Sequence, residues 1–300
     1  MIRKGVMPAM TTAFNPDFSL DRAAIAQRAQ WLIASGCTGI VALGSLGEAA
    51  TLTVPEKKTV LETVRSAIGA PLVAAISGLS TAETVDLGKM ALNAGCDGLM
   101  VLPPYVYRGD WREMKAHVSA IFRATPLPCM LYNNPVAYGT DFTPEQIAEF
   151  AAGHADLAAV KESSTDVRRV TAIRALIADR LALFIGVDDA IVEGIAAGAV
   201  GWVAGLANAF PQESVALFDL ASAGRWREAY ELYHWFLPLL RLDTVPKFIQ
   251  LIKLAEARAG VGAATVRPPR LELAGDELKS AAGLIDEAIA RRPPLPKVAP

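Results

Sequence analysis

Short apolar segments alternate with longer amphipathic segments along most of this chain. Uninterrupted apolar runs of about four to eight residues are typical of parallel strands that are covered on both faces. Eight such strands are predicted, over residues 6–11, 40–43, 72–76, 99–102, 129–132, 157–161, 181–185 and 202–204. The helices between them are predicted to begin near Asp21, Pro55, Thr81, Asp110, Pro144, Asp166, Asp188 and Pro211. Asp21, Thr143 and Asp166 suit N-caps or first turns, and Pro55 suits a first helical position.

A faint internal repeat supports this alternation. Gly36-Cys37-Thr38-Gly39, Gly95-Cys96-Asp97-Gly98 and Gly198-Ala199-Val200-Gly201 each lie between a helical segment and an apolar strand. A glycine directly after a helix favours the left-handed backbone conformation that ends the helix. The repeated unit is therefore helix, glycine stop and strand.

Eight strand–helix units in roughly 220 residues predict a (β/α)8 TIM barrel, an α/β fold. We expect this barrel, with the active site, over residues 1–222. The alternative is a doubly wound open sheet, but no GxGxxG motif follows the first strand. Beyond residue 223 the strand pattern stops. Helices are predicted over 226–240, 246–259 and 276–290, so residues 223–300 form a C-terminal helical extension with an extended, poorly ordered proline-rich tail at 292–296.

Composition restricts the function classes. Hydrophobic residues make up 52% of the 300 residues and the formal net charge is −2, which indicates a large core and disfavours nucleic acid or an anionic membrane as partner. We expect no membrane span, because no run of about 18 apolar residues occurs. The N-terminus lacks the apolar region of a signal peptide, and three widely spaced cysteines suggest a reducing cytoplasm. The three histidines do not cluster, so we expect no metal site.

Lys161 is the strongest candidate for chemistry. It ends the apolar run at 156–160 and precedes a polar segment. Burial disfavours an ammonium group and lowers its pKa, which is what a lysine that forms a Schiff base requires. The alternative interpretation is a lysine whose amine extends into solvent at the strand end.

Two further segments follow predicted strands. Gly44-Ser45-Leu46-Gly47-Glu48 follows the second strand, and Tyr132-Asn133-Asn134-Pro135 follows the fifth. The carboxyl ends of barrel strands open on one face, so both segments should lie on the face that holds Lys161. Tyr132 and Lys161 come from neighbouring strands and should lie close together. Taken alone, the glycine-rich segment is also typical of a tight turn, and Tyr132 of a half-buried core tyrosine.

In combination, these segments resemble the dihydrodipicolinate synthase/N-acetylneuraminate lyase family of class I, pyruvate-handling lyases. The resemblance also includes Pro103-Pro104-Tyr105, Val160-Lys161-Glu162-Ser163 and Gly186-Val187-Asp188-Asp189. It implies that Lys161 forms an imine with the 2-oxo carbon of a small 2-oxo acid or cyclic imino acid. Tyr132 would then carry protons and Ser45 would link it to a relay. It further implies no cofactor besides the covalent imine, and a homotetramer.

The resemblance also implies a substrate-binding set, and this set contains departures from the family pattern. The backbone of Gly44, Ser45, Leu46 and Gly47 would bind the carboxylate, and the Val203 carbonyl would line the pocket. Leu46 replaces a second hydroxyl residue, and Val106 replaces a tyrosine for which Tyr107 is the nearest substitute. Ala137 stands where the synthase has an arginine for a second carboxylate. That loss removes a bidentate contact and disfavours lysine biosynthesis.

Two segments in the C-terminal half are similar to one branch of the family. Residues 201–211 and the Leu242-Asp243-x-x-x-Lys247-x-x-Gln250-x-x-Lys253 pattern resemble 1-pyrroline-4-hydroxy-2-carboxylate deaminases. That deaminase is our leading hypothesis. The alternatives are 4-hydroxy-tetrahydrodipicolinate (dihydrodipicolinate) synthase, a 2-oxo-3-deoxy sugar acid aldolase, a metal-dependent aldolase, and an inactive paralogue that binds a 2-oxo acid.

Overall fold

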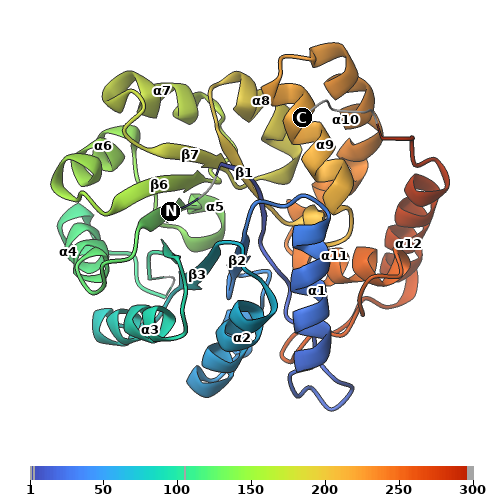
Figure 1. The fold of residues 1–300 in the computed structure, drawn as a ribbon, viewed down its shortest axis with the longest axis horizontal. Helices are drawn as coiled ribbons and strands as arrows, with labels where there is room; N and C mark the ends of the chain where they lie inside the picture. Colours follow the sequence, from blue (N-terminus) through green and yellow to red (C-terminus); the bar gives the residue numbers. More distant parts are fainter. Residues whose placement is uncertain (1, 3, 105, 296–300) are drawn as a thin grey trace.

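The strands of the protein form a single parallel barrel. The computed structural model describes residues 2, 4–104 and 106–295. The strands are β1 (Gly5–Pro8), β2 (Ile40–Ala42), β3 (Leu72–Ile76), β4 (Gly98–Val101), β5 (Cys129–Asn133), β6 (Leu157–Glu162), β7 (Ala182–Ile185) and β8 (Gly201–Ala204). They pair in the order β1-β8-β7-β6-β5-β4-β3-β2, all parallel. Figure 1 shows them at the centre of the molecule with helices around them.

The chain after β1 closes the barrel. Ala9 N donates to Ala204 O at the β8 side, and Met10 N donates to Val41 O at the β2 side. The first strand is therefore shorter than the predicted 6–11, because the chain changes partner after Pro8. This closure, together with the sequential strand order, confirms the predicted (β/α)8 barrel over the open doubly wound sheet.

The helices follow the strands as the sequence predicts. They are α1 (Arg22–Ala34), α2 (Val54–Ala67), α3 (Thr81–Asn93), α4 (Trp111–Phe122), α6 (Pro144–Gly153), α7 (Arg168–Ile177), α8 (Ile191–Ala196) and α9 (Pro211–Ser222). Asp21 caps α1 through Ala24 N, and Thr143 caps α6 in a capping box with Gln146. Pro55 is the second residue of α2 rather than the first, because Thr53 is its N-cap. Such caps satisfy backbone donors that a helix start leaves unpaired.

Several short helices were not predicted. The most important is α5 (Pro135–Tyr138), directly after β5. Four 3-10 turns also occur in the described part of the chain: η1 (Ala49–Thr51), η2 (Asp188–Ala190), η3 (Leu206–Asn208) and η4 (Arg241–Asp243). The predicted start at Asp188 belongs to η2, which precedes α8. A single turn has too few residues to show a hydrophobic period, so the pattern could not reveal these elements.

The repeated glycines have the predicted conformation. Gly36, Gly95 and Gly198 have φ angles of +99°, +81° and +104°. These values lie in a region that side chains with a Cβ rarely enter. Each glycine ends a helix and turns the chain back towards the barrel.

The C-terminal helices lie together at one side of the barrel. They are α10 (Trp226–Leu240), α11 (Phe248–Arg258) and α12 (Gly275–Ala290), and Figure 1 shows them beside α9 and α1. The described part of the tail packs on the protein: Arg292 forms an ion pair with Glu213, and Leu295 contacts the core. The expectation of a poorly ordered tail therefore does not hold for these residues, and Pro296 lies outside the described ones.

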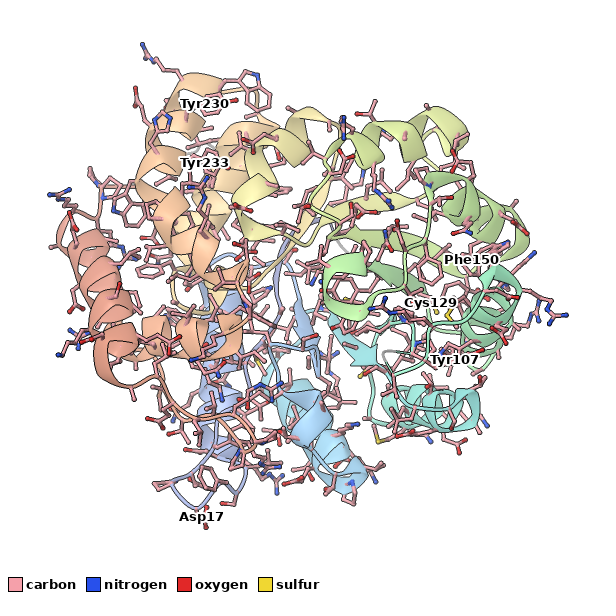
Figure 2. All side chains as sticks on the ribbon, turned by 180° about the vertical axis from the view of Figure 1, so that it is seen from behind. Asp17, Tyr107, Cys129, Phe150, Tyr230 and Tyr233 are labelled. Atoms are coloured by element: carbon pink, nitrogen blue, oxygen red, sulfur yellow. The ribbon has the colours of Figure 1, made fainter. Side chains whose placement is uncertain are left out.

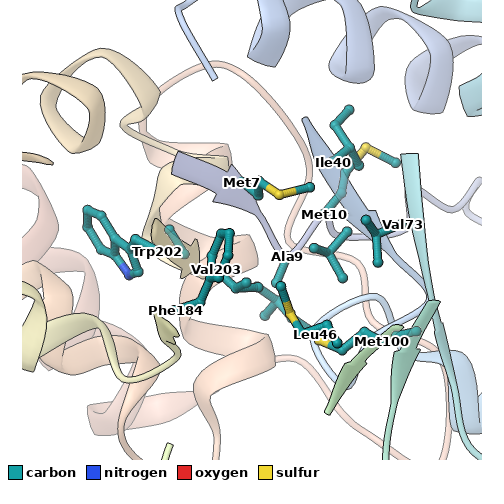
Figure 3. Packing of buried hydrophobic residues seen from close by; sticks show 14 of the residues in the cluster. Met7, Ala9, Met10, Ile40, Leu46, Val73, Met100, Phe184, Trp202 and Val203 are labelled. Carbon is teal, nitrogen blue, oxygen red and sulfur yellow. The ribbon is translucent and has the colours of Figure 1, made fainter. Parts of the chain in front are cut away.

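Apolar side chains fill the barrel. Figure 3 shows Met7, Met10 and Ile40 together near β1 and β2, and Leu46 beside Met100 close to Ala9 and Val203. The three cysteines are buried free thiols, and burial raises the pKa of each to about 12. Among the described helices, none is long and apolar enough to cross a membrane.

Candidate active site

A cavity of about 480 Å³ opens at the carboxyl ends of the strands. In TIM barrels this face carries the chemistry, because loops from several strands converge there. Most lining residues come from the barrel strands or the segments that follow them and from α5. The C-terminal extension contributes the remainder: Asp243, Thr244, Val245, Pro246, Phe248, Ile249 and Arg270.

Lys161 points into this cavity from β6. Its side chain is only 6% exposed, and its Nζ lies 4.2 Å from the ring centroid of Tyr132. The two residues are directly paired between β5 and β6, as the sequence predicts. Burial lowers the pKa of Lys161, and the nearby Asp243 partly opposes this effect. A buried amine with a lowered pKa is available in the neutral, nucleophilic form.

Gly186 makes room for Lys161. It follows β7 and lines the cavity. A Cβ at this position would stand 2.2 Å from Lys161 Cε and 2.1 Å from Ser163 Oγ. Only glycine therefore permits the observed path of the lysine side chain.

Tyr132 is a buried phenol beside the amine. Burial raises its pKa to about 12, and a hydrogen bond from Asn134 Nδ2 (3.0 Å to Tyr132 Oη) partly opposes the rise. The hydroxyl therefore keeps its proton at neutral pH and can pass protons by accepting one as it releases another. This is the form needed for proton transfer at an imine carbon.

Ser45 is connected to Tyr138 rather than directly to Tyr132. The two hydroxyl groups share a hydrogen bond between the loop after β2 and α5. The Tyr138 ring packs edge-on against Tyr132, with centroids 5.8 Å apart. Ser45 is thus joined to Tyr138 by a hydrogen bond, and Tyr138 to Tyr132 by a ring contact.

The loop after β2 has a constrained backbone. Leu43 and Glu48 flank it with φ angles of +62° and +54°, which are unusual for residues other than glycine. Within the described residues, the amides of Ser45 and Leu46 donate no hydrogen bond, while Glu48 N donates to Ser45 O. Unpaired amides in a strained loop are suited to bind an anion such as a carboxylate.

The C-terminal extension anchors this loop through Glu48. The Glu48 carboxylate is fully buried and accepts from Lys253 Nζ at 2.5 Å and from Arg267 N at 3.0 Å. Arg270 Nη1 lies 3.7 Å from the same carboxylate. Two segments more than 200 residues apart in sequence are thus held together at the cavity.

Most of the predicted site residues meet at the cavity. Gly44, Ser45, Leu46, Tyr132, Lys161 and Val203 all line it. Gly47 is not among the lining residues: its carbonyl accepts from Thr12 Oγ1 at 2.7 Å, and its Cα faces Met10 O. Gly47 therefore shapes the turn of the loop.

Tyr107 is not among the residues that line the cavity of the described chain. Its side chain is 56% exposed at the surface (Figure 2). Its hydroxyl donates to the Glu113 carboxylate in the first turn of α4. Tyr138 of α5 lines the cavity together with Tyr132. Tyr105, which the family resemblance includes, lies outside the described residues.

Several cavity residues were not predicted as site residues from the sequence. Among them are Tyr138, Ser163, Asp243 and Arg270. Ser163 follows Lys161 by two positions and is 1% exposed. Period-two alternation along β6 would place Ser163 on the same side as Lys161, so a signal for it existed. Asp243 and Arg270 lie far outside the strands, and no local signal places them at this face.

Comparisons with known proteins agree with this geometry. Residues 3–288 match the model of the dihydrodipicolinate synthetase family. The chain is 32% identical to the 4-hydroxy-tetrahydrodipicolinate synthase of Methanothrix thermoacetophila over 270 residues, which covers 89% of this chain and 90% of that protein. It is 33% identical to 4-hydroxy-tetrahydrodipicolinate synthase 1 of Streptomyces coelicolor over 279 residues, which covers 92% and 90%.

A solved structure of a named family member is also similar to this chain. Dihydrodipicolinate synthase DapA-2 from Bacillus anthracis superposes with a TM-score of 0.91 at 27% identity, and the match covers 95% of this chain and 99% of that chain. The similarity therefore includes the barrel and the C-terminal helices. The chain belongs to the dihydrodipicolinate synthetase family and is a class I, Schiff-base-forming lyase.

Proposed function

We propose that this protein is a 1-pyrroline-4-hydroxy-2-carboxylate deaminase with Lys161 as its nucleophile. The observation that carries the proposal is the chemical character of α5. This helix presents Ala137 and the Tyr138 hydroxyl to the cavity, and no cation. A wall without a guanidinium group suits a compact substrate with a single carboxylate better than one with two.

The site residues have defined roles in this reaction. The backbone of Gly44, Ser45 and Leu46 binds the carboxylate, and the Val203 carbonyl borders the pocket. Tyr132 transfers protons at the imine carbon. The Ser45–Tyr138 hydrogen bond continues the proton path away from Tyr132.

The reaction begins with the neutral amine of Lys161. It adds to C2 of the cyclic imine, and cleavage of the bond between C2 and the ring nitrogen opens the ring. The resulting protonated imine at C2 is an electron sink, so a C3 proton is lost and the C4 hydroxyl leaves as water. The C3=C4 double bond then shifts towards the nitrogen on C5: a C5 proton is lost, C3 and C4 gain protons, and C5 becomes an imine carbon. Hydrolysis of the imines at C5 and C2 consumes two water molecules and releases ammonia, 2,5-dioxopentanoate and the free Lys161 amine. The net reaction therefore adds one water molecule and removes one ammonia.

The imine supplies the electron sink, so we infer that the reaction needs neither a metal nor an organic cofactor. Activity that is unchanged after dialysis against a chelator would agree with this inference. Loss of activity that zinc or magnesium restores would contradict it and favour a metal-dependent aldolase.

A second candidate function is 4-hydroxy-tetrahydrodipicolinate synthase. Two relatives compared above carry that name, and Arg270 of the C-terminal extension lines the cavity. Its guanidinium group is engaged with Glu48 but is 27% exposed, so it can also face a second carboxylate. This is the specific observation that favours the synthase.

Borohydride trapping followed by peptide mass spectrometry tests the proposal. Pyruvate and 1-pyrroline-4-hydroxy-2-carboxylate are offered separately to the wild type, to Lys161→Ala and to the control Lys57→Ala on α2. We expect a reduced adduct on Lys161 in the wild type and the control, with ammonia released only from the pyrroline. Trapping of pyruvate without ammonia release, together with synthase or aldolase turnover, would favour those alternatives.

The absence of any adduct would contradict the imine mechanism and return Lys161 to a structural role. Retention of 2-oxo acid affinity by Lys161→Ala, with no turnover by the wild type, would identify an inactive binding paralogue.

We also propose that the chain forms a homo-oligomer, with a tetramer as the expected state. Val106, Tyr107 and Val136 are apolar or aromatic side chains that are 74%, 56% and 74% exposed. The loop holding the first two lies beside α5, because the Arg108 side chain contacts Gly139. Exposed apolar groups of this kind are typical of interaction surfaces. Sedimentation analysis tests the proposal, and a monomer at micromolar concentration would contradict it.

A further inference from the structure

Asp243 brings a carboxyl group to the cavity from outside the barrel. It is the last residue of η4, between α10 and α11, and lines the same cavity as Lys161. Its Oδ1 lies only 2.2 Å from the point where a Cβ on Gly205 would stand. Gly205 follows β8 directly and also lines the cavity. The absence of a side chain at Gly205 thus lets the carboxyl reach the strand ends.

The other acidic groups near Asp243 are already paired. Asp188 accepts from Trp202 Nε1 (2.9 Å), Gly205 N (3.0 Å) and Leu206 N (2.7 Å). Asp189 lies 3.5 Å from the guanidinium group of Arg241. Asp243, by contrast, has no hydrogen-bond partner among the residues that the structure describes. It is the acidic group of this cluster that is available to a bound molecule.

The surroundings of Asp243 favour its protonated form. Burial, and then the charge of Asp188, raise its pKa well above the ordinary value, while Lys161 opposes the rise. Formation of an imine changes this balance, because a fixed positive charge replaces a neutral amine. A nearby positive charge stabilises the carboxylate and so promotes release of the proton. This positive charge returns to the nitrogen as the enamine expels the C4 oxygen, so proton transfer from Asp243 is favoured at that step.

We propose that Asp243 is the acid that protonates the hydroxyl group leaving from the carbon β to the imine carbon. The inference rests on the proposed function, in which that hydroxyl is on C4 of the opened pyrroline. The C3–H bond breaks, and its proton passes towards solvent through the Tyr132 hydroxyl, which accepts it while releasing its own. The electron pair forms the C2=C3 enamine.

The enamine electrons then form the C3=C4 bond as the C4–O bond breaks. The oxygen takes the Asp243 proton and departs as water, and solvent later returns a proton to the carboxylate. An aldolase would instead need a base to remove the proton of the C4 hydroxyl. A carboxyl that enters the reaction protonated therefore selects dehydration over C3–C4 cleavage.

The experiment compares Asp243→Asn and Asp243→Glu with the wild type on two compounds. These are 1-pyrroline-4-hydroxy-2-carboxylate and its 4-fluoro analogue, whose fluoride needs no proton to leave. We expect Asp243→Asn to release ammonia from the hydroxy compound at least about 100-fold more slowly, which is typical for loss of a general acid. Both variants should still form the borohydride-trapped pyruvate adduct on Lys161.

The fluoro analogue distinguishes an acid from a structural residue. We expect Asp243→Asn to release fluoride within about threefold of the wild-type rate, and Asp243→Glu to retain part of the activity on the hydroxy compound. Equal losses on both compounds would overturn the proposal, as would near wild-type deamination by Asp243→Asn. Loss of pyruvate trapping in Asp243→Asn would also overturn it, because Asp243 would then be required for imine formation.

Failure of the proposed function gives a different result. In that case the wild type itself would trap pyruvate but release ammonia from neither compound. The acid role of Asp243 towards this substrate would be rejected together with that function, whereas the outcomes above reject the acid role alone.

Discussion

The Ser45 and Tyr138 hydroxyl groups form a hydrogen bond between the loop after β2 and helix α5. Tyr138 also packs edge-on against Tyr132, which lies beside the Lys161 amine. The contact therefore connects the loop that we propose to bind the carboxylate with the group that we propose to move protons.

Removal of one hydroxyl tests this connection. We expect Tyr138→Phe to lower kcat roughly tenfold, in keeping with the loss of a hydrogen bond at a reacting centre, with little change in KM. Steady-state ammonia release measures the effect. Tyr230→Phe, at a 42% exposed position on α10, is the matched control and should keep wild-type kinetics. An unchanged kcat in Tyr138→Phe would mean that the proton path does not include Tyr138.

A methyl group at Gly186 should obstruct Lys161. A Cβ at this position would meet Lys161 Cε at 2.2 Å, so we expect Gly186→Ala to abolish borohydride trapping of pyruvate. Gly283→Ala on α12 is the control, since no atom lies within 4 Å of its added Cβ. That control should raise helix stability by about 0.5–1 kcal/mol. Normal trapping by Gly186→Ala would show that the lysine can take another path.

Loss of the Glu48 charge should loosen the C-terminal extension. Glu48→Gln leaves Lys253 buried without its carboxylate partner, and breaking a buried pair in this way typically costs about 3–5 kcal/mol. We expect denaturant titration to show a loss of this order. The control Glu62→Gln removes an exposed i,i+4 pair with Lys58 and should change stability by less than about 0.5 kcal/mol. Equal losses of stability from the two substitutions would mean that the Glu48–Lys253 ion pair does not anchor the C-terminal extension.

Stability should depend on pH through Lys161. Its pKa is lowered by burial from the ordinary value of 10.5, so between the two values the unfolded state binds more protons than the folded state. The contribution of this residue to folding stability therefore rises with pH up to the unfolded pKa, and is lost as pH falls through the lowered one. Lys161→Met removes the cost of burying a charged amine at low pH.

We therefore expect Lys161→Met to exceed the wild type in melting temperature most at low pH, with a difference that shrinks as pH approaches 10.5. Thermal melts over a pH series measure it, and Lys58→Met, at an exposed position on α2, controls for the substitution itself. A difference that grows with pH would mean that Lys161 is charged in the folded protein.

The local pattern of residues along the chain was sufficient to predict the barrel. Eight apolar runs, the capping residues Asp21 and Thr143, and three glycine stops each report on neighbouring residues, and the structure agrees with them. The convergence of Lys161, Tyr132 and Ser45 also followed from the sequence, because parallel strands end on a common face. This inference required the topology but no side-chain detail.

The remaining site residues depend on contacts that no local pattern encodes. Tyr138 reaches the cavity because Pro135 and Asn134 start a single helical turn, which is too short for a detectable period. Asp243 belongs to a segment some 80 residues after Lys161, and it lies at the cavity because of the packing of α10 and α11. Tyr107 is the tyrosine nearest to Val106 in sequence, and in the described chain its hydroxyl donates to Glu113 at the surface.

The C-terminal helices lie outside the eight strand–helix units, yet they supply Asp243 and Arg270 to the cavity. Lys161 and Tyr132 belong to the barrel, whereas these two ionisable groups belong to the helical extension. Divergence in that extension can therefore change which substrate is accepted while imine formation is preserved. In this chain, substrate activation and substrate selection therefore depend on different parts: the barrel and the C-terminal extension.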